Sequence, residues 1–174
     1  MAALIRSLRR FVRAQSGAEV IEFALTLPLL LLVVLGIIEF GFLFQEYEVV
    51  TNAAREGARI AVLPTYSADA ASTQANVTAR VNQYLSTAGL STASATIYGG
   101  SGCPGACTWL PAIDTIITGP PAVCIKVFPV TVHYAHPVAF ARGITIFFGK
   151  TLPTTITLKA TARMRNEVPS ASCS

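Results

Sequence analysis

The longest apolar stretch of the chain lies near its N-terminus. Residues 24–38 carry no charge, and the apolar character resumes after Glu39 and continues to Phe44. A helix from Phe23 to Phe44 would rise about 33 Å, which is enough to cross the hydrocarbon core of a membrane. The pattern therefore predicts a transmembrane helix over residues 18–44.

Helical spacing continues beyond this span to Leu63, where Pro64 ends it. We expect residues 45–63 to be a periplasmic extension of the same helix, whose inner stripe is Tyr47, Val50, Ala54, Gly57 and Ala61. Small residues on this stripe allow another element to approach closely, and we favour the chain's own sheet over another subunit. The whole helix would run from Glu19 to Leu63, broken or bent at Pro28, Gly36 and Gly41.

Residues 64–174 have the pattern of a small exported domain. Residues 67–90 predict a second helix with Ser67 as its N-cap and Gly89 as its stop, and its apolar face contains Val77, Val81 and Leu85. Period-two alternation then predicts strands over residues 93–100, 122–137, 143–149 and 154–166. Pro129 indicates an edge strand or a bulge. The fold class is α+β: a long transmembrane helix, one further helix and an antiparallel sheet.

The basic charge of the chain is concentrated at one end. Four of its thirteen Lys and Arg residues lie in the first seventeen positions, where there is no acid. In the rest of the chain, the charge of nine Lys and Arg is balanced by nine Asp and Glu. Positive charge before an apolar helix favours a cytoplasmic N-terminus at the inner membrane and a periplasmic C-terminal domain. The remainder has no basic run of the kind that binds phosphate backbones, so nucleic acid is not an expected partner.

Two kinds of proteolytic processing are compatible with this N-terminus. A signal peptidase would cut after the apolar run, where residues 51–53 have suitable chemistry but lie well beyond it. A cut before the run, after Gly17, would leave the apolar helix on the mature protein. Glycine at this position lets the backbone approach a peptidase closely, although a flexible hinge is the simpler explanation.

Three separated motifs point to one family. Gly17 is followed five residues later by Glu22 and then by Phe23, in the sequence GAEVIEFALTLP. IIEFG and TNAAREGAR follow at residues 37–41 and 51–59. Together they resemble the TadE-like minor pilins of the Tad (Flp) pilus, a type IVc pilus. Residues 164–167, MRNE, resemble the closing strand of the same family.

The resemblance implies a role in pilus assembly for adhesion. It implies that residues 1–17 are a leader that a prepilin peptidase removes between Gly17 and Ala18. Glu22 would then pair with the new Ala18 amine of its own chain or a neighbour's, and Phe23 belongs to the same processing motif. Pro28 would be a helix hinge. The family motif of the extension comprises Asn52, Ala53, Ala54, Arg55, Glu56, Gly57 and Arg59.

Simpler roles remain open for these groups. Glu19, Glu22 and Glu39 also fit carboxylates that reach the headgroup region, and Pro28 fits a kink absorbed by membrane packing. The partners that the resemblance implies are the prepilin peptidase, the major pilin, other minor pilins, the inner-membrane assembly platform and the lipid bilayer.

All four cysteines follow the apolar span. Cys103, Cys107, Cys124 and Cys173 would therefore lie in a compartment where disulfides persist. A short Cys103–Cys107 loop with a Cys124–Cys173 bond is one of three possible pairings, and the sequence does not choose among them. Zinc is the alternative, but the spacing is not a C-x2-C pair.

The sequence contains no constellation typical of an enzyme. His133 and His136 are three apart in a strand-like run, which sends them to opposite faces, and acids are sparse between Glu56 and Glu167. We expect no catalysis, no cofactor and no metal. A membrane-anchored periplasmic binding module with an uncut leader is the alternative function, and an enzyme released by signal peptidase is a remote third.

Overall fold

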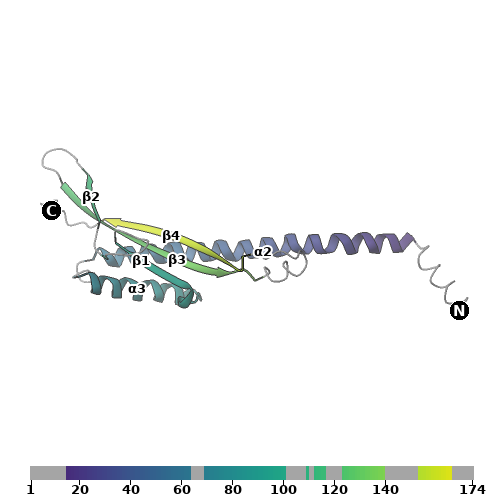
Figure 1. The fold of residues 1–174 in the computed structure, drawn as a ribbon, viewed down its shortest axis with the longest axis horizontal. Helices are drawn as coiled ribbons and strands as arrows, with labels where there is room; N and C mark the ends of the chain where they lie inside the picture. The colour runs from purple at the N-terminus through teal and green to yellow at the C-terminus, as the bar shows by residue number, and fades with distance from the viewer. Residues whose placement is uncertain are drawn as a thin grey trace, which may run out of the picture. The chain divides into compact units, whose positions relative to one another are not determined.

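The computed structural model describes residues 15–63, 69–100, 109, 112–116, 123–139 and 153–165. The chain divides into two compact units, residues 1–42 and 43–174. The elements are helices α2 (Gln15–Ala61) and α3 (Ala70–Thr87), the short 3-10 helix η1 (Thr92–Ser94), and strands β1 (Ala95–Gly99), β2 (Ala112–Ile116), β3 (Val123–Pro137) and β4 (Thr155–Arg165) (Figure 1). The α+β class is as the sequence predicts.

Helix α2 is continuous over 47 residues. It begins at Gln15 rather than Glu19 and ends at Ala61 rather than Leu63, with a closing turn in which the Leu63 N–H donates to the Ile60 carbonyl (3.2 Å). The helix is not broken at Pro28, because it continues through this residue. A bend or hinge at Pro28 stays a prediction. Proline removes one hydrogen bond to the preceding turn, and the helical bonds on both sides suffice to keep the helix intact.

Helix α3 is capped by side chains at its start and by a glycine at its end. Asp69, not the predicted Ser67, is the N-cap: its carboxylate accepts from the Ser72 N–H (2.7 Å), and the Asp69 N–H donates to the Ser72 hydroxyl (3.2 Å). This capping box satisfies two free N–H groups. Gly89 follows the helix at φ +79°, and the Leu90 N–H reaches the Leu85 carbonyl (2.9 Å), so the predicted stop is confirmed.

The sheet is built around β3, which lies between its neighbours in Figure 1. β4 pairs antiparallel with residues 127–137 of β3. On the opposite edge, β2 pairs with residues 123–127 and β1 with residues 130–134. Strand β2 is absent from the sequence prediction, and the strand predicted at residues 143–149 lies outside the described residues.

Pro129 lies in the central strand, so the prediction of an edge strand or bulge there is wrong. The register with β4 continues through the Pro129–Arg163 pair. The Pro129 carbonyl accepts from the Gly100 N–H (3.0 Å), which shows that the proline's own backbone nitrogen faces the β1 and β2 edge. That edge has a gap between β2 and β1 at this point, so the missing N–H interrupts no ladder.

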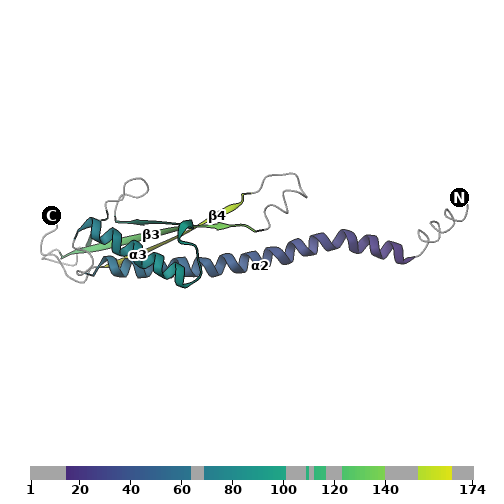
Figure 2. The ribbon, with the colours of Figure 1, turned by 90° about the horizontal axis from the view of Figure 1, so that it is seen from below.

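One face of the sheet is buried against the helices (Figure 2). The buried positions alternate along the strands, as expected for a sheet covered on one side. They are Phe128, Val130, Val132, Tyr134 and His136 on β3 and Leu158, Ala160 and Ala162 on β4. Val77, Val81 and Leu85 of α3 are fully buried, as predicted.

Helix α2 contributes small residues to this core: Val50, Ala53, Ala54, Gly57, Ala58 and Ala61. The expectation that this stripe covers the chain's own sheet is confirmed, but Tyr47 is 44% exposed and does not belong to it. Gly57 lies where α2, α3 and β3 meet: a Cβ there would stand 2.7 Å from Val81 Cγ2 and 3.3 Å from Val130 Cγ1. Its missing side chain lets the three elements approach.

We expect Gly57→Val to destabilise residues 43–174 by about 1–3 kcal/mol, because the added methyl groups overlap a stiff, fully buried valine. Trp109 is the only tryptophan and is buried, so its fluorescence reports unfolding by denaturant. In the double variant with Val81→Ala, the loss should be smaller than the sum of the single losses. Gly41→Ala is the control, since a Cβ there meets nothing within 4 Å. Additive losses would contradict the proposed contact.

Candidate membrane and assembly segment

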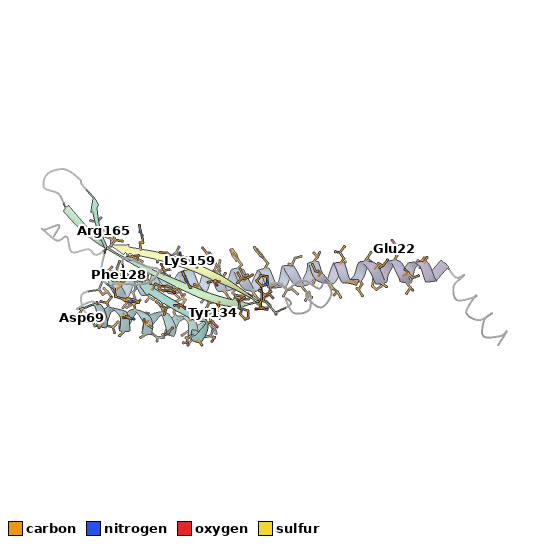
Figure 3. The ribbon with its side chains drawn as sticks, in the orientation of Figure 1. Glu22, Asp69, Phe128, Tyr134, Lys159 and Arg165 are labelled. Atoms are coloured by element: carbon orange, nitrogen blue, oxygen red, sulfur yellow. The ribbon has the colours of Figure 1, made fainter. Side chains whose placement is uncertain are left out.

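The N-terminal part of α2 exposes apolar side chains around its whole circumference (Figure 3). Val20, Leu25, Leu29, Leu30, Ile37 and Phe40 are each more than 60% exposed. Such a surface is unfavourable in water, and a helix that is apolar all round is typical of burial in lipid or in a large core. Of the described helices, α2 is long and apolar enough to cross a membrane. This helix supports membrane anchoring.

The predicted cleavage site lies within the first turn of α2. Gly17 and Ala18 are both helical, and Ala18 is exposed. Glu22 follows Ala18 by four residues, so it lies one turn further along the same face, and it is exposed too. Its backbone carbonyl accepts from the Thr26 hydroxyl (3.0 Å), which gives that hydroxyl a partner within an apolar segment. Phe23 is exposed as well.

The TNAAREGAR motif divides into an inner and an outer set. Ala53, Ala54 and Gly57 face the core, whereas Asn52, Arg55 and Arg59 are exposed. Glu56 lies between the two sets. The inner residues determine how closely α2 packs, and the two exposed arginines are available for ion pairs.

Glu56 pairs with two arginines: Arg59 on its own helix and Arg80 on α3, and the second pair connects α2 to α3. Its Oε1 lies 2.7 Å from Arg80 Nη2 and 3.0 Å from Arg59 Nη2. Arg80 also donates to the Gln83 side-chain oxygen (3.1 Å). Hydrogen bonds from Arg59 and then from Arg80 hold the pKa of Glu56 below its usual value. Arg80 is not recognisable from the sequence, because 24 residues separate it from Glu56 and no local pattern links them.

A second long-range pair joins the sheet to α2. His136 Nδ1 lies 2.7 Å from Glu46 Oε2, and His136 is 5% exposed. The neighbouring Tyr134 has its pKa raised by burial and by the Glu46 carboxylate. His133 lies on the other face of the sheet, as predicted, with its ring 4.9 Å from that of Tyr98. Burial and then the Lys159 charge lower the pKa of His133.

The cysteine predictions fall mostly beyond the described part of the chain. Cys103, Cys107 and Cys173 lie outside the described residues. Cys124 is on β3, opposite Thr115 of β2, and its side chain is not described. Within the described ranges no three His, Cys, Asp or Glu side chains are grouped so that they could hold a metal ion. The disulfides therefore stay predictions.

Comparison with known proteins adds one finding. Residues 17–59 match the family model of TadE-like proteins. This segment of the chain is TadE-like, as its motifs predicted, and the match indicates a protein associated with the Tad pilus. No curated protein and no solved structure matches the chain. The matched residues extend from the expected cleavage site, through the exposed apolar helix, to the Glu56–Arg59 pair.

We expect Glu56→Gln to destabilise residues 43–174 by up to about 1 kcal/mol at neutral pH, because it removes an ion-pair network that is partly exposed. The folded-state pKa of Glu56 lies below the ordinary value of 4.5, so its contribution is fully present above pH 4.5. It is lost as the pH falls below 4.5 through the folded-state pKa.

Denaturant unfolding at pH 7 and at a series of values below 4.5 measures this difference. The free energies of unfolding of the wild type and Glu56→Gln should converge as the pH falls. Glu48→Gln, which alters an exposed carboxylate on the same helix, should follow the wild type at every pH. A difference in free energy of unfolding between the wild type and Glu56→Gln that stays constant with pH would show that the charge of Glu56 does not cause the destabilisation.

Proposed function

We propose that this protein is a TadE-like minor pilin that takes part in the assembly of Tad pili for adhesion. Residues 1–17 are its leader, residues 18–44 cross the inner membrane, residues 45–63 extend the helix, and residues 64–174 form the exported domain. The observation that carries the proposal is an exposed, predominantly apolar helix whose family match starts at Gly17, with Glu22 one turn beyond Ala18.

Cleavage after Gly17 would give Ala18 a positively charged amine at the edge of the bilayer. An unpaired charge in or near lipid is costly, and Glu22 offers the opposite charge one turn away. The same carboxylate is exposed along the helix, so it is equally accessible to the amine of a neighbouring subunit. Pairing between chains would favour one register of subunits in an assembling filament.

The position of the bond within α2 constrains the cleavage step. A peptidase binds its substrate extended, so the first turn has to unwind around Gly17. Helix ends fray readily, and glycine costs a helix about 1 kcal/mol relative to alanine, which favours unwinding here. The prepilin peptidase, the major pilin, other minor pilins and the assembly platform are the partners that this role requires.

The alternative function is a membrane-anchored periplasmic binding module that keeps its leader. A groove of about 540 Å³, lined by Arg59, Ile60, Leu63, Asn76, Ala79, Arg80 and Gln83, is the observation that favours it. The groove is open, and Glu56 already pairs with both of its arginines. Its charge is therefore partly neutralised, and we favour the pilin function.

We expect the mature protein to begin at Ala18 and Gly17→Val to retain the leader, because a branched side chain blocks close approach of the backbone to the peptidase. Gly17→Ala should be cut more slowly than the wild type. Mass spectrometry of the intact protein from host membranes distinguishes these forms, with Gly36→Ala as a control outside the site. An uncut wild-type chain in cells that process other prepilins would support the binding module, and a cut near Ala53 would support secretion.

We expect Glu22→Gln to be cleaved normally but to fail in pilus assembly, because it removes the charge opposite the Ala18 amine at almost constant shape. Glu19→Gln is the matched control: it removes a carboxylate one position from Ala18 and should assemble. Counting pili by electron microscopy, with N-terminal mass spectrometry in parallel, measures both steps. Normal piliation by Glu22→Gln would refute the pairing while leaving cleavage untouched.

A further inference from the structure

The outer edge of β4 has no strand partner among the described residues. β4 pairs only with β3 in the described sheet, and its register is constant over all eleven residue pairs, so no bulge interrupts it. Long, regular open edges attract other strands, and proteins usually shorten, bend, cover or charge them. Of these four devices, the described part of the chain uses only charge at β4.

The backbone groups that point outward from this edge can be identified from the ladder. The Gly100–Pro129 bond places the polar groups of Pro129 toward β1, and alternation places those of Val130 and Val132 toward β4. The backbone N–H and C=O groups of their partners, Ala162 and Ala160, therefore point toward β3. Consequently, the N–H and C=O groups of Thr157, Lys159, Thr161 and Arg163 point away from the sheet.

The exposed face of β4 carries charge of a single sign. Lys159, Arg163 and Arg165 lie on this face together with Thr161, all three are exposed, and the strand contains no acid. Figure 3 labels Lys159 and Arg165. A second copy is a poor partner for this edge: an antiparallel β4–β4 pair centred on Thr161 would place Lys159 opposite Arg163. Like charges directly opposite each other destabilise a strand pair. Acidic side chains at the same positions would stabilise it.

We propose that the outer edge of β4 binds an extended segment of another protein, which adds to the sheet as a further strand and places acidic residues opposite Lys159, Arg163 and Arg165. Main-chain hydrogen bonds provide affinity in this mode of recognition, and the alternating side chains provide specificity. The row of positive charge excludes a second copy and selects an acidic partner. This interaction goes beyond pilin assembly through the membrane helix and does not depend on it.

The test uses the full chain in detergent micelles and a capped eleven-residue peptide that alternates glutamate and valine. Amide hydrogen exchange measured by NMR should slow at Thr157, Lys159, Thr161 and Arg163 when the peptide is added. Exchange at Ala160 and Ala162 should already be slow. A peptide with lysine in place of glutamate should not bind. A glutamate peptide that is N-methylated at the backbone N–H groups that would face β4 should not bind either.

Charge reversal provides the matched variants. The double variant Lys159→Glu, Arg163→Glu should bind the glutamate peptide about tenfold or more weakly than the wild type does, and it should bind the lysine peptide. Arg55→Glu, an equally exposed reversal on α2, should leave both affinities unchanged. Equal binding of the methylated peptide would overturn strand addition, and so would outward amides that are already protected without peptide, whether by dimerisation or by the chain itself.

Discussion

The close approach of α2 to α3 and the sheet at Gly57 determines how the described part of residues 43–174 is built. Small side chains at Ala53, Ala54 and Ala58 extend this contact along the helix, so large apolar residues of α3 and β3 fill the space that α2 leaves. Dense packing makes such a contact sensitive to single methyl groups. The TNAAREGAR motif is therefore first a packing motif. Two of its charged residues, Glu56 and Arg59, reinforce the packing from outside, because Glu56 also pairs with Arg80 of α3.

Helix α2 is one continuous element with two different surroundings. Its first part is apolar and exposed on every side, as a lipid-facing helix is, whereas from Val50 onward its buried side is confined to one small-residue stripe. The pair Glu46–His136, just before this second part, connects α2 to β3, and the pair Glu56–Arg80 connects it to α3.

The sequence revealed those features that depend on local periodicity. The apolar span, the small-residue stripe, the buried face of α3 and the stop at Gly89 all follow from spacing along one element. It did not reveal β2, because AIDTI is short and has Asp114 at its centre, nor the choice of Asp69 over Ser67 as the cap.

Long-range contacts were equally hidden. Glu46 and His136 are 90 residues apart, and the acceptance of Pro129 in a central strand depends on a gap between two other strands. The membrane segment and its motifs were predictable, whereas the pairs that secure the domain were not.

Photolabelling from within the bilayer distinguishes the lipid-facing part of α2 from the part that packs in the protein core. The protein is reconstituted in phospholipid vesicles with a lipid-soluble diazirine, irradiated, digested and mapped by mass spectrometry. Label should be concentrated within residues 18–44 and absent from residues 50–61, whose apolar side chains are buried against α3 and the sheet. Label spread evenly along α2, or absent from residues 18–44, would show that α2 is not divided between lipid and the protein core.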